Sequence, residues 1–226
     1  NYPEAMFVVT QPSPLHVGPN TVTVTVTAAD GVTVRVYTIT VVRAPSSNSL
    51  LSGLTVLPAT LSPAFHPDIT SYASSVSNAV TSVSVNATVA EPAAHYVVLG
   101  PAANLQVGEN TITIQVTAQD GVTVTSYSVV ITRAASSNNN VASLDIVPAD
   151  LALVPPFDPD VTTYTATVAH SVTSLSITPN LADATATVLV SVPPPPLAVG
   201  PNTVIISVTA KDGTHKNYTF TVTRLP

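Results

Sequence analysis

Histidine is the residue type in this sequence best suited to acid–base or metal chemistry, because its imidazole titrates near neutral pH and binds transition metals. No two of the five histidines have the spacing that brings metal ligands together on a helix or a hairpin. No serine stands in a Gly-x-Ser-x-Gly elbow, and the glycines are scattered singly rather than gathered in a phosphate-binding loop. We therefore expect no catalytic residue, no metal ligand and no cofactor, and expect surface or loop positions for His16, His66, His95, His170 and His215.

The closest pair of carboxylates is Asp158 and Asp160, on either side of a proline. Calcium takes roughly six to eight oxygen ligands, and a calcium loop supplies several of them from alternate positions. A similar stretch earlier in the chain has His66 in place of the first carboxylate. Local turn formation explains these aspartates better than a bound ion does.

The composition excludes several classes of protein. Charged residues make up 8% of the 226 residues, and the formal charge is −6, which excludes a protein that binds nucleic acid by neutralising phosphates. The absence of cysteine excludes disulfide scaffolds, thiolate metal sites and thiol nucleophiles. Threonine or serine interrupts nearly every apolar run, so no stretch approaches the roughly 20 apolar residues of a membrane span. No signal-peptide pattern opens the sequence.

The chain repeats itself, and the repeat predicts how it is organised. A Gly-x-Asn-Thr motif begins at Gly18, Gly108 and Gly200, in steps of 90 and 92 residues, and an Asp-Gly pair, a tyrosine and an arginine follow each time. The earlier half of the repeat occurs only twice, over 54–72 and 144–164, and carries a Phe-x-Pro-Asp motif before a tyrosine. We therefore predict the C-terminal half of a repeat followed by two complete repeats, over residues 1–46, 47–136 and 137–226.

Within each repeat the hydrophobic period is two, which is typical of β-strands. Residues 21–27 and 111–117 alternate polar residues with valine or isoleucine, so one face would be buried and the other solvated. The Asp-Gly pairs after such strands predict hairpin turns, because glycine accepts a positive φ. The apolar positions shift by one residue after the turn, which predicts a β-bulge near Thr125. The predicted fold class is all-β, with each complete repeat an antiparallel two-sheet sandwich of about seven short strands.

The recurring motifs resemble those of a known family. Leu-x-x-Leu-x-Pro-like and Phe-x-Pro-Asp motifs, Gly-x-Asn-Thr, Asp-Gly and a closing Thr-Arg are together similar to the cadherin-like β-sandwich repeats. The resemblance covers nearly the whole chain and implies tandem Ig-like sandwiches of the kind found in large extracellular and cell-surface proteins. It is a resemblance of architecture, and it does not carry over the calcium sites of cadherins.

Two signals suggest modification outside the cell. Asn86 and Asn217 each begin an N-glycosylation sequon, and their neighbours of opposite parity are expected to face inward, which directs both asparagines to solvent. Prolines also cluster in one predicted loop of successive repeats. Two interpretations stay open: a stiff loop that protects an edge strand, or hydroxylation and O-glycosylation in an algal or plant-type secretory pathway. The prolines concerned are Pro12, Pro14, Pro101, Pro193, Pro194, Pro195 and Pro196.

These observations favour a non-enzymatic structural protein outside the cell or on its surface, in a stalk, fibre or wall layer of regularly spaced sandwiches. The alternative is an adhesive or carbohydrate-binding accessory module of a larger secreted protein. Such a module needs an exposed aromatic platform, and the sequence has no tryptophan. Only Tyr2 and Tyr96 fall outside the repeated inward positions.

The half-repeat at the start of the sequence predicts a surface for assembly. With no N-terminal half to cover it, six apolar side chains of its inward face would stay exposed to water. The burial free energy lost in this way is on the order of 10 kcal/mol. Upstream residues of a longer chain could complete it, or a neighbouring molecule could insert strands in a head-to-tail contact. The predicted assembly face consists of Val22, Val24, Val26, Tyr37, Ile39 and Val41.

Overall fold

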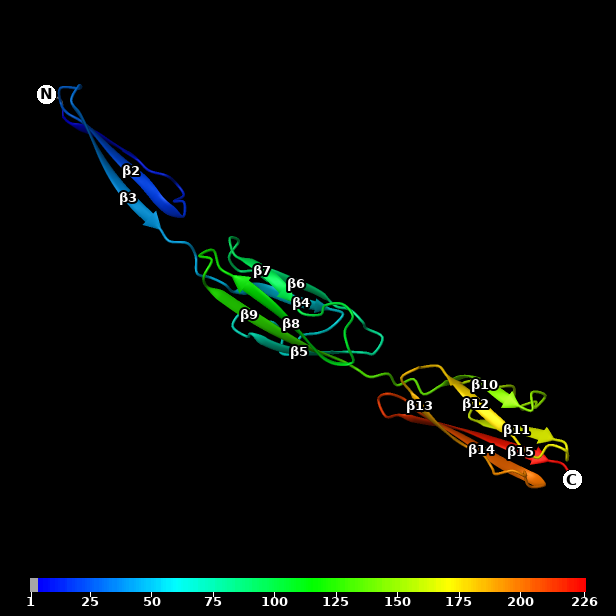
Figure 1. The fold of residues 1–226 in the computed structure, drawn as a ribbon. Coiled ribbons are helices and arrows are strands. Elements are labelled where there is room, and N and C mark those ends of the chain that lie inside the picture. The colour runs from blue at the N-terminus through cyan, green and yellow to red at the C-terminus, as the bar shows by residue number, and fades with distance from the viewer. Residues whose placement is uncertain (1–3) are drawn as a thin grey trace. The chain divides into compact units, whose positions relative to one another are not determined.

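The computed structural model describes residues 4–226, and this part of the chain consists of β-strands and loops (Figure 1). The chain divides into two compact units, and each contains one complete β-sandwich. The predicted all-β fold of tandem sandwiches is therefore confirmed. Within the described residues, no helix has the length and apolar character needed to cross a membrane.

The first complete sandwich has six strands: β4 (Leu51–Leu57), β5 (Ser71–Val76), β6 (Ser84–Val89), β7 (His95–Leu99), β8 (Gly108–Thr117) and β9 (Val124–Arg133). Strands β4 and β6 form a two-stranded sheet, and the other sheet has the order β5-β9-β8-β7. Fully buried residues such as Ile112, Ile114 and Tyr127 form the core. The alternation in β8 produces this core, because every second side chain of a strand points to the same face.

The second complete sandwich repeats this topology with β10 (Val141–Val147), β11 (Thr163–Val168), β12 (Ser176–Leu181), β13 (Thr187–Ser191), β14 (Gly200–Thr209) and β15 (His215–Arg224). Its strand β11 runs parallel to β15, from Thr163 opposite Thr219 to Val168 opposite Arg224. The parallel pair departs from the predicted antiparallel sandwich. It is possible because the long connection between β11 and β15 passes through the other sheet and returns.

Each complete sandwich has six strands where about seven were predicted. The stretch between its first two strands is rich in proline, which has no N–H to donate to a ladder. One residue of that stretch still forms an isolated bridge: Ser62 with Ala73 in the first sandwich, and Val154 with Thr165 in the second.

The chain begins with a three-stranded antiparallel sheet of β1 (Met6–Thr10), β2 (Gly18–Thr27) and β3 (Val34–Arg43), here called the open sheet. It corresponds to β7–β9 and β13–β15, the C-terminal halves of the complete sandwiches. The N-terminal halves are β4–β6 and β10–β12. Neither hydrophobic core includes a residue of the open sheet. Residues 4–226 thus contain three C-terminal halves and two N-terminal halves.

The Asp-Gly pairs lie in hairpin turns, as the sequence predicted. Asp30 Oδ1 accepts hydrogen bonds from the backbone N–H groups of Val32 at 2.9 Å and Thr33 at 2.8 Å, and the Thr33 hydroxyl donates to Oδ2 at 2.6 Å. These bonds, the hydroxyl of Thr33 first among them, lower the pKa of Asp30 to about 2. Asp120 and Asp212 accept similar bonds, which lower their pKa as well. Asp-Gly is therefore used here to fix a turn.

A β-bulge was predicted near Thr125, and the equivalent hairpins of the first and third repeats have none. Strand β2 pairs with β3 without interruption, and β14 pairs with β15 in the same way. Val122 and Val124, whose positions suggested the shift, are both exposed, so neither has to point into the core. The third repeat is one residue shorter because its turn is shorter, over 210–214 rather than 28–33.

Candidate functional site

The structure leaves the five histidines dispersed and exposed. Within residues 4–226 no group of three or more His, Cys, Asp or Glu side chains could hold a metal ion. His66 Nδ1 lies 3.7 Å from Asp68 Oδ2, and His215 Nδ1 lies 2.9 Å from the Thr209 hydroxyl. These are surface interactions between neighbours in a turn or across a hairpin.

The carboxylates Asp158 and Asp160 take part in turn and ion-pair interactions. Asp158 Oδ1 accepts a hydrogen bond from the N–H of Asp160 at 2.8 Å, and Asp160 Oδ1 lies 3.9 Å from Lys216 Nζ. The Lys216 ammonium also donates to the carbonyl of Pro159 at 2.6 Å. The positive charge beside Asp160 is therefore supplied by a side chain of the protein itself.

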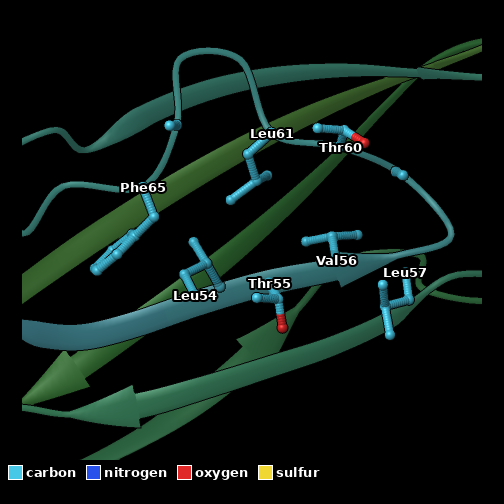
Figure 2. Close-up of a pocket in the computed structure, with 9 residues that line it drawn as sticks. Leu54, Thr55, Val56, Leu57, Thr60, Leu61 and Phe65 are labelled. Atoms are coloured by element: carbon cyan, nitrogen blue, oxygen red, sulfur yellow. The ribbon is translucent and has the colours of Figure 1, made fainter.

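A cavity of about 330 Å³ lies between strand β4 and the loop that follows it, as Figure 2 shows. No titratable side chain lines it, and its polar groups are the hydroxyls of two threonines. Such a wall offers neither acid–base chemistry nor charge for orienting a ligand. The lining residues are Leu54, Thr55, Val56, Leu57, Ala59, Thr60, Leu61, Ala64 and Phe65.

The apolar face of the open sheet is exposed to solvent. Tyr37 is 54% exposed, Ile39 53% and Val41 37%, whereas the equivalent residues of both complete sandwiches are fully buried. The valines at positions 22, 24 and 26 are half-buried, and their equivalents are again fully buried. The open sheet therefore has the side chains of a sandwich core without the sheet that would cover them.

The open sheet is nevertheless held in the conformation of a complete repeat. Asn20, which is buried, accepts a hydrogen bond from the N–H of His16 at 2.8 Å and donates to the carbonyls of His16 at 2.7 Å and Gly18 at 2.9 Å. Asn110 and Asn202 make the corresponding bonds in the complete sandwiches. The frame of the sheet thus forms without the missing half.

Sequence reasoning missed the contribution of β1 to this face. Phe7 lies opposite Val26 and Val9 opposite Val24 in the β1–β2 pairing. Phe7 is 71% exposed. The apolar run over 6–9 was a signal for this strand, but it is short, does not alternate and follows no turn motif.

The two sequon asparagines lie on the solvent side of their strands. Asn86 is exposed on β6 between the half-buried Val85 and Ala87, and Asn217 is exposed on β15 beside the buried Tyr218. Both side chains are therefore accessible to a modifying enzyme.

The prolines of interest lie in the same loop of each repeat, between β1 and β2, between β7 and β8, and between β13 and β14. Pro12 and Pro193 are half-buried. The exposed ones are Pro14, Pro101, Pro194, Pro195 and Pro196. Of the aromatic candidates for a carbohydrate platform, Tyr96 is 39% exposed on edge strand β7, and Tyr2 lies outside the described residues.

A family model and several known proteins are similar to this chain. The family model described as cadherin-like beta sandwich domain matches residues 3–44, 51–134 and 141–225, so it recognises the open sheet as well as both sandwiches. A protein of Evansella cellulosilytica, provisionally named a membrane protein, is 37% identical over 97 residues. That alignment takes in 39% of this chain, and the chain spans only about 15% of that relative's length.

Among solved structures, the EC1–3 fragment of Drosophila N-cadherin is similar at 11% identity and a TM-score of 0.32, with 98% of this chain and 89% of that chain covered. The EC21–23 fragment of human CDH23 is similar at 13% identity and a TM-score of 0.33, with 97% and 88% covered.

Proposed function

Because the chain belongs to the family of the cadherin-like beta sandwich domain, we propose that it serves outside the cell as a non-enzymatic structural protein. Tandem domains of this family are extracellular adhesive or structural modules, and the family is non-enzymatic. The proposed role is that of a stalk, fibre or wall component in which sandwiches follow one another along the chain. Such a role requires stable folded units in series rather than a binding pocket.

The exposed apolar face of the open sheet carries this proposal. The equivalents of its residues are fully buried in both complete sandwiches, where an N-terminal half covers them. Upstream residues of a longer chain or strands of a neighbouring molecule would complete it. Free sheet edges favour such strand addition.

Hydrogen exchange on the 226-residue chain tests this proposal. The backbone amides of Val22, Val24 and Val26 should exchange faster than those of their equivalents in β8, and the chain should associate as its concentration rises in analytical ultracentrifugation. A chain that stays monomeric at high concentration with these amides fully protected would contradict the proposal.

We also propose that the protein is glycosylated, at the exposed sequons Asn86 and Asn217 or at the proline loops. A surface with only 8% charged residues gains solubility from attached glycans. The intact mass of the native protein, before and after enzymatic removal of N-glycans, tests this. A native mass equal to that of the bare polypeptide would contradict it.

A further inference from the structure

The phenol of Tyr37 occupies the position at which both complete sandwiches bind their N-terminal half. In the first sandwich the equivalent Tyr127 donates to the carbonyl of Pro67 at 2.8 Å and accepts from the N–H of Leu51 at 3.1 Å. Tyr218 makes the same two bonds in the second sandwich, to the carbonyl of Pro159 at 2.8 Å and from the N–H of Val141 at 3.1 Å. Each tyrosine hydroxyl thus holds the first strand and the Phe-x-Pro-Asp turn of the N-terminal half together.

The phenylalanine of that turn packs beside the same tyrosine. Phe65 lies 6.4 Å from Tyr127 between ring centroids, with an angle of 47° between the rings. Phe157 lies 6.2 Å from Tyr218 at 46°. Tilted aromatic pairs at this separation are favourable beyond the area that they bury.

Arg43 is the second group that the missing half leaves without its partner. The equivalent Arg133 donates from Nε at 2.9 Å and from Nη2 at 2.6 Å to the carbonyl of Asn78, in the loop between β5 and β6. Arg224 donates from Nε at 2.9 Å and from Nη2 at 2.6 Å to the carbonyl of His170 in the equivalent loop. Within the described residues Arg43 bonds only through Nη1, to the carbonyl of Leu15 at 2.9 Å.

The free edge of β3 completes the site. In the second sandwich β11 pairs in parallel with β15 from Thr219 to Arg224, and the equivalent edge of β3 runs over 38–43. No strand of the open sheet lies on that edge, since the order is β1-β2-β3. A strand that follows a Phe-x-Pro-Asp turn can therefore add to β3 in the register of the complete repeats.

Copies of residues 4–226 alone cannot supply such a strand to every open sheet. An assembly of residues 4–226 alone contains three C-terminal halves for every two N-terminal halves. Exchange of strands between copies therefore moves the open face from one molecule to another without filling it. Two open sheets packed face to face would meet through side chains, whereas the Tyr37 hydroxyl and the Arg43 guanidinium match backbone carbonyl and amide groups.

We propose that the open sheet is a binding site for a polypeptide with the chemistry of this repeat's N-terminal half, supplied from outside these 226 residues and recognised by Tyr37 and Arg43. This inference rests on the proposed function, since it names the partner of the same exposed face. Tyr37 would take the proline carbonyl and the first-strand amide, and Arg43 the carbonyl after the second strand.

The test adds residues 47–90 as a separate polypeptide to the full 226-residue chain. We expect saturable binding, with protection of the amides of Val22 to Val26 in hydrogen exchange. The substitutions Tyr37→Phe and Arg43→Lys should each weaken binding by about tenfold, because each leaves buried backbone groups of the partner without a hydrogen bond. Tyr96→Phe, on edge strand β7 of a different sheet, should leave binding unchanged.

A second arm fuses residues 47–90 directly before Tyr2 in the full chain. This junction keeps the spacing of a complete repeat, because His95 and Met6 occupy equivalent positions beside their partner strands. We expect a third cooperative unfolding transition, whose midpoint falls with Tyr37→Phe as that of the native sandwich falls with Tyr127→Phe.

The possible outcomes separate this inference from the proposed function. Binding or folding that is indifferent to Tyr37→Phe and Arg43→Lys overturns the inference and leaves the proposed function standing. Absence of binding and of a third transition overturns the inference as well. If Val22 to Val26 are already protected in the chain alone, both proposals fail.

Discussion

Alanine substitution at one equivalent valine in each repeat tests whether the open sheet is uncovered in solution. Val116 and Val208 are fully buried, whereas Val26 is half-buried in the open sheet. The change removes two carbons, worth about 0.8 kcal/mol each in transfer, and leaves a cavity that raises the total to about 2–3 kcal/mol in a packed core. At roughly 4–8 °C per kcal/mol for a domain of this size, the affected sandwich should melt about 10–20 °C lower.

Differential scanning calorimetry on the 226-residue chain measures this effect. Val116→Ala should lower the transition of the first sandwich and Val208→Ala that of the second, while Val26→Ala should change neither. Val122→Ala is the matched control, because Val122 is exposed and its truncation should change stability by less than about 0.5 kcal/mol. If Val26→Ala lowered a melting transition by as much as Val116→Ala does, the reasoning would be refuted, because the face of the open sheet would then have to be covered.

Three further predictions concern the sandwiches. Tyr127→Phe should destabilise the first sandwich by about 1–3 kcal/mol in urea unfolding, because the carbonyl and amide that its hydroxyl satisfies stay buried; an unchanged midpoint would contradict this. Burial raises the pKa of Tyr127 and Tyr164, so the unfolded chain loses these protons first, and melting temperatures should fall as the pH rises above about 10; a flat profile there would contradict it. A chelator should lower the melting temperature by less than about 5 °C, since no group of three or more possible ligands lies within residues 4–226; a larger drop would reveal a bound ion.

The alternation of residue types was enough to predict the buried face of the C-terminal half in both complete sandwiches. Thr and Gln alternate with Ile112, Ile114 and Val116 in β8, and all three apolar residues are fully buried. The Asp-Gly turns were predictable for the same reason: their signal is local. The shift in apolar positions after the turn predicted a bulge that β2–β3 and β14–β15 do not have, since an apolar residue such as Val34 is exposed there.

The partners of the buried tyrosines were beyond reach of the sequence. Leu51 and Pro67 meet the hydroxyl of Tyr127 from positions 76 and 60 residues earlier in the chain. Nothing local encodes such pairings, since they follow from the crossover between the two sheets. The parallel pairing of β11 with β15 was missed for the same reason. Glycosylation and assembly stay predictions.

That parallel pair determines how a complete sandwich responds to tension. Once β10 has been pulled out, a force between the two ends of the chain reaches β11 at its start, Thr163, and β15 at its end, Arg224. Since the two strands run in the same direction, such a force slides one along the other. The ladder from Thr163 to Val168 is then loaded in shear, so its hydrogen bonds resist together instead of opening one after another from an end. In the second sandwich this ladder is therefore expected to give the main resistance to stretching after β10 has been pulled out.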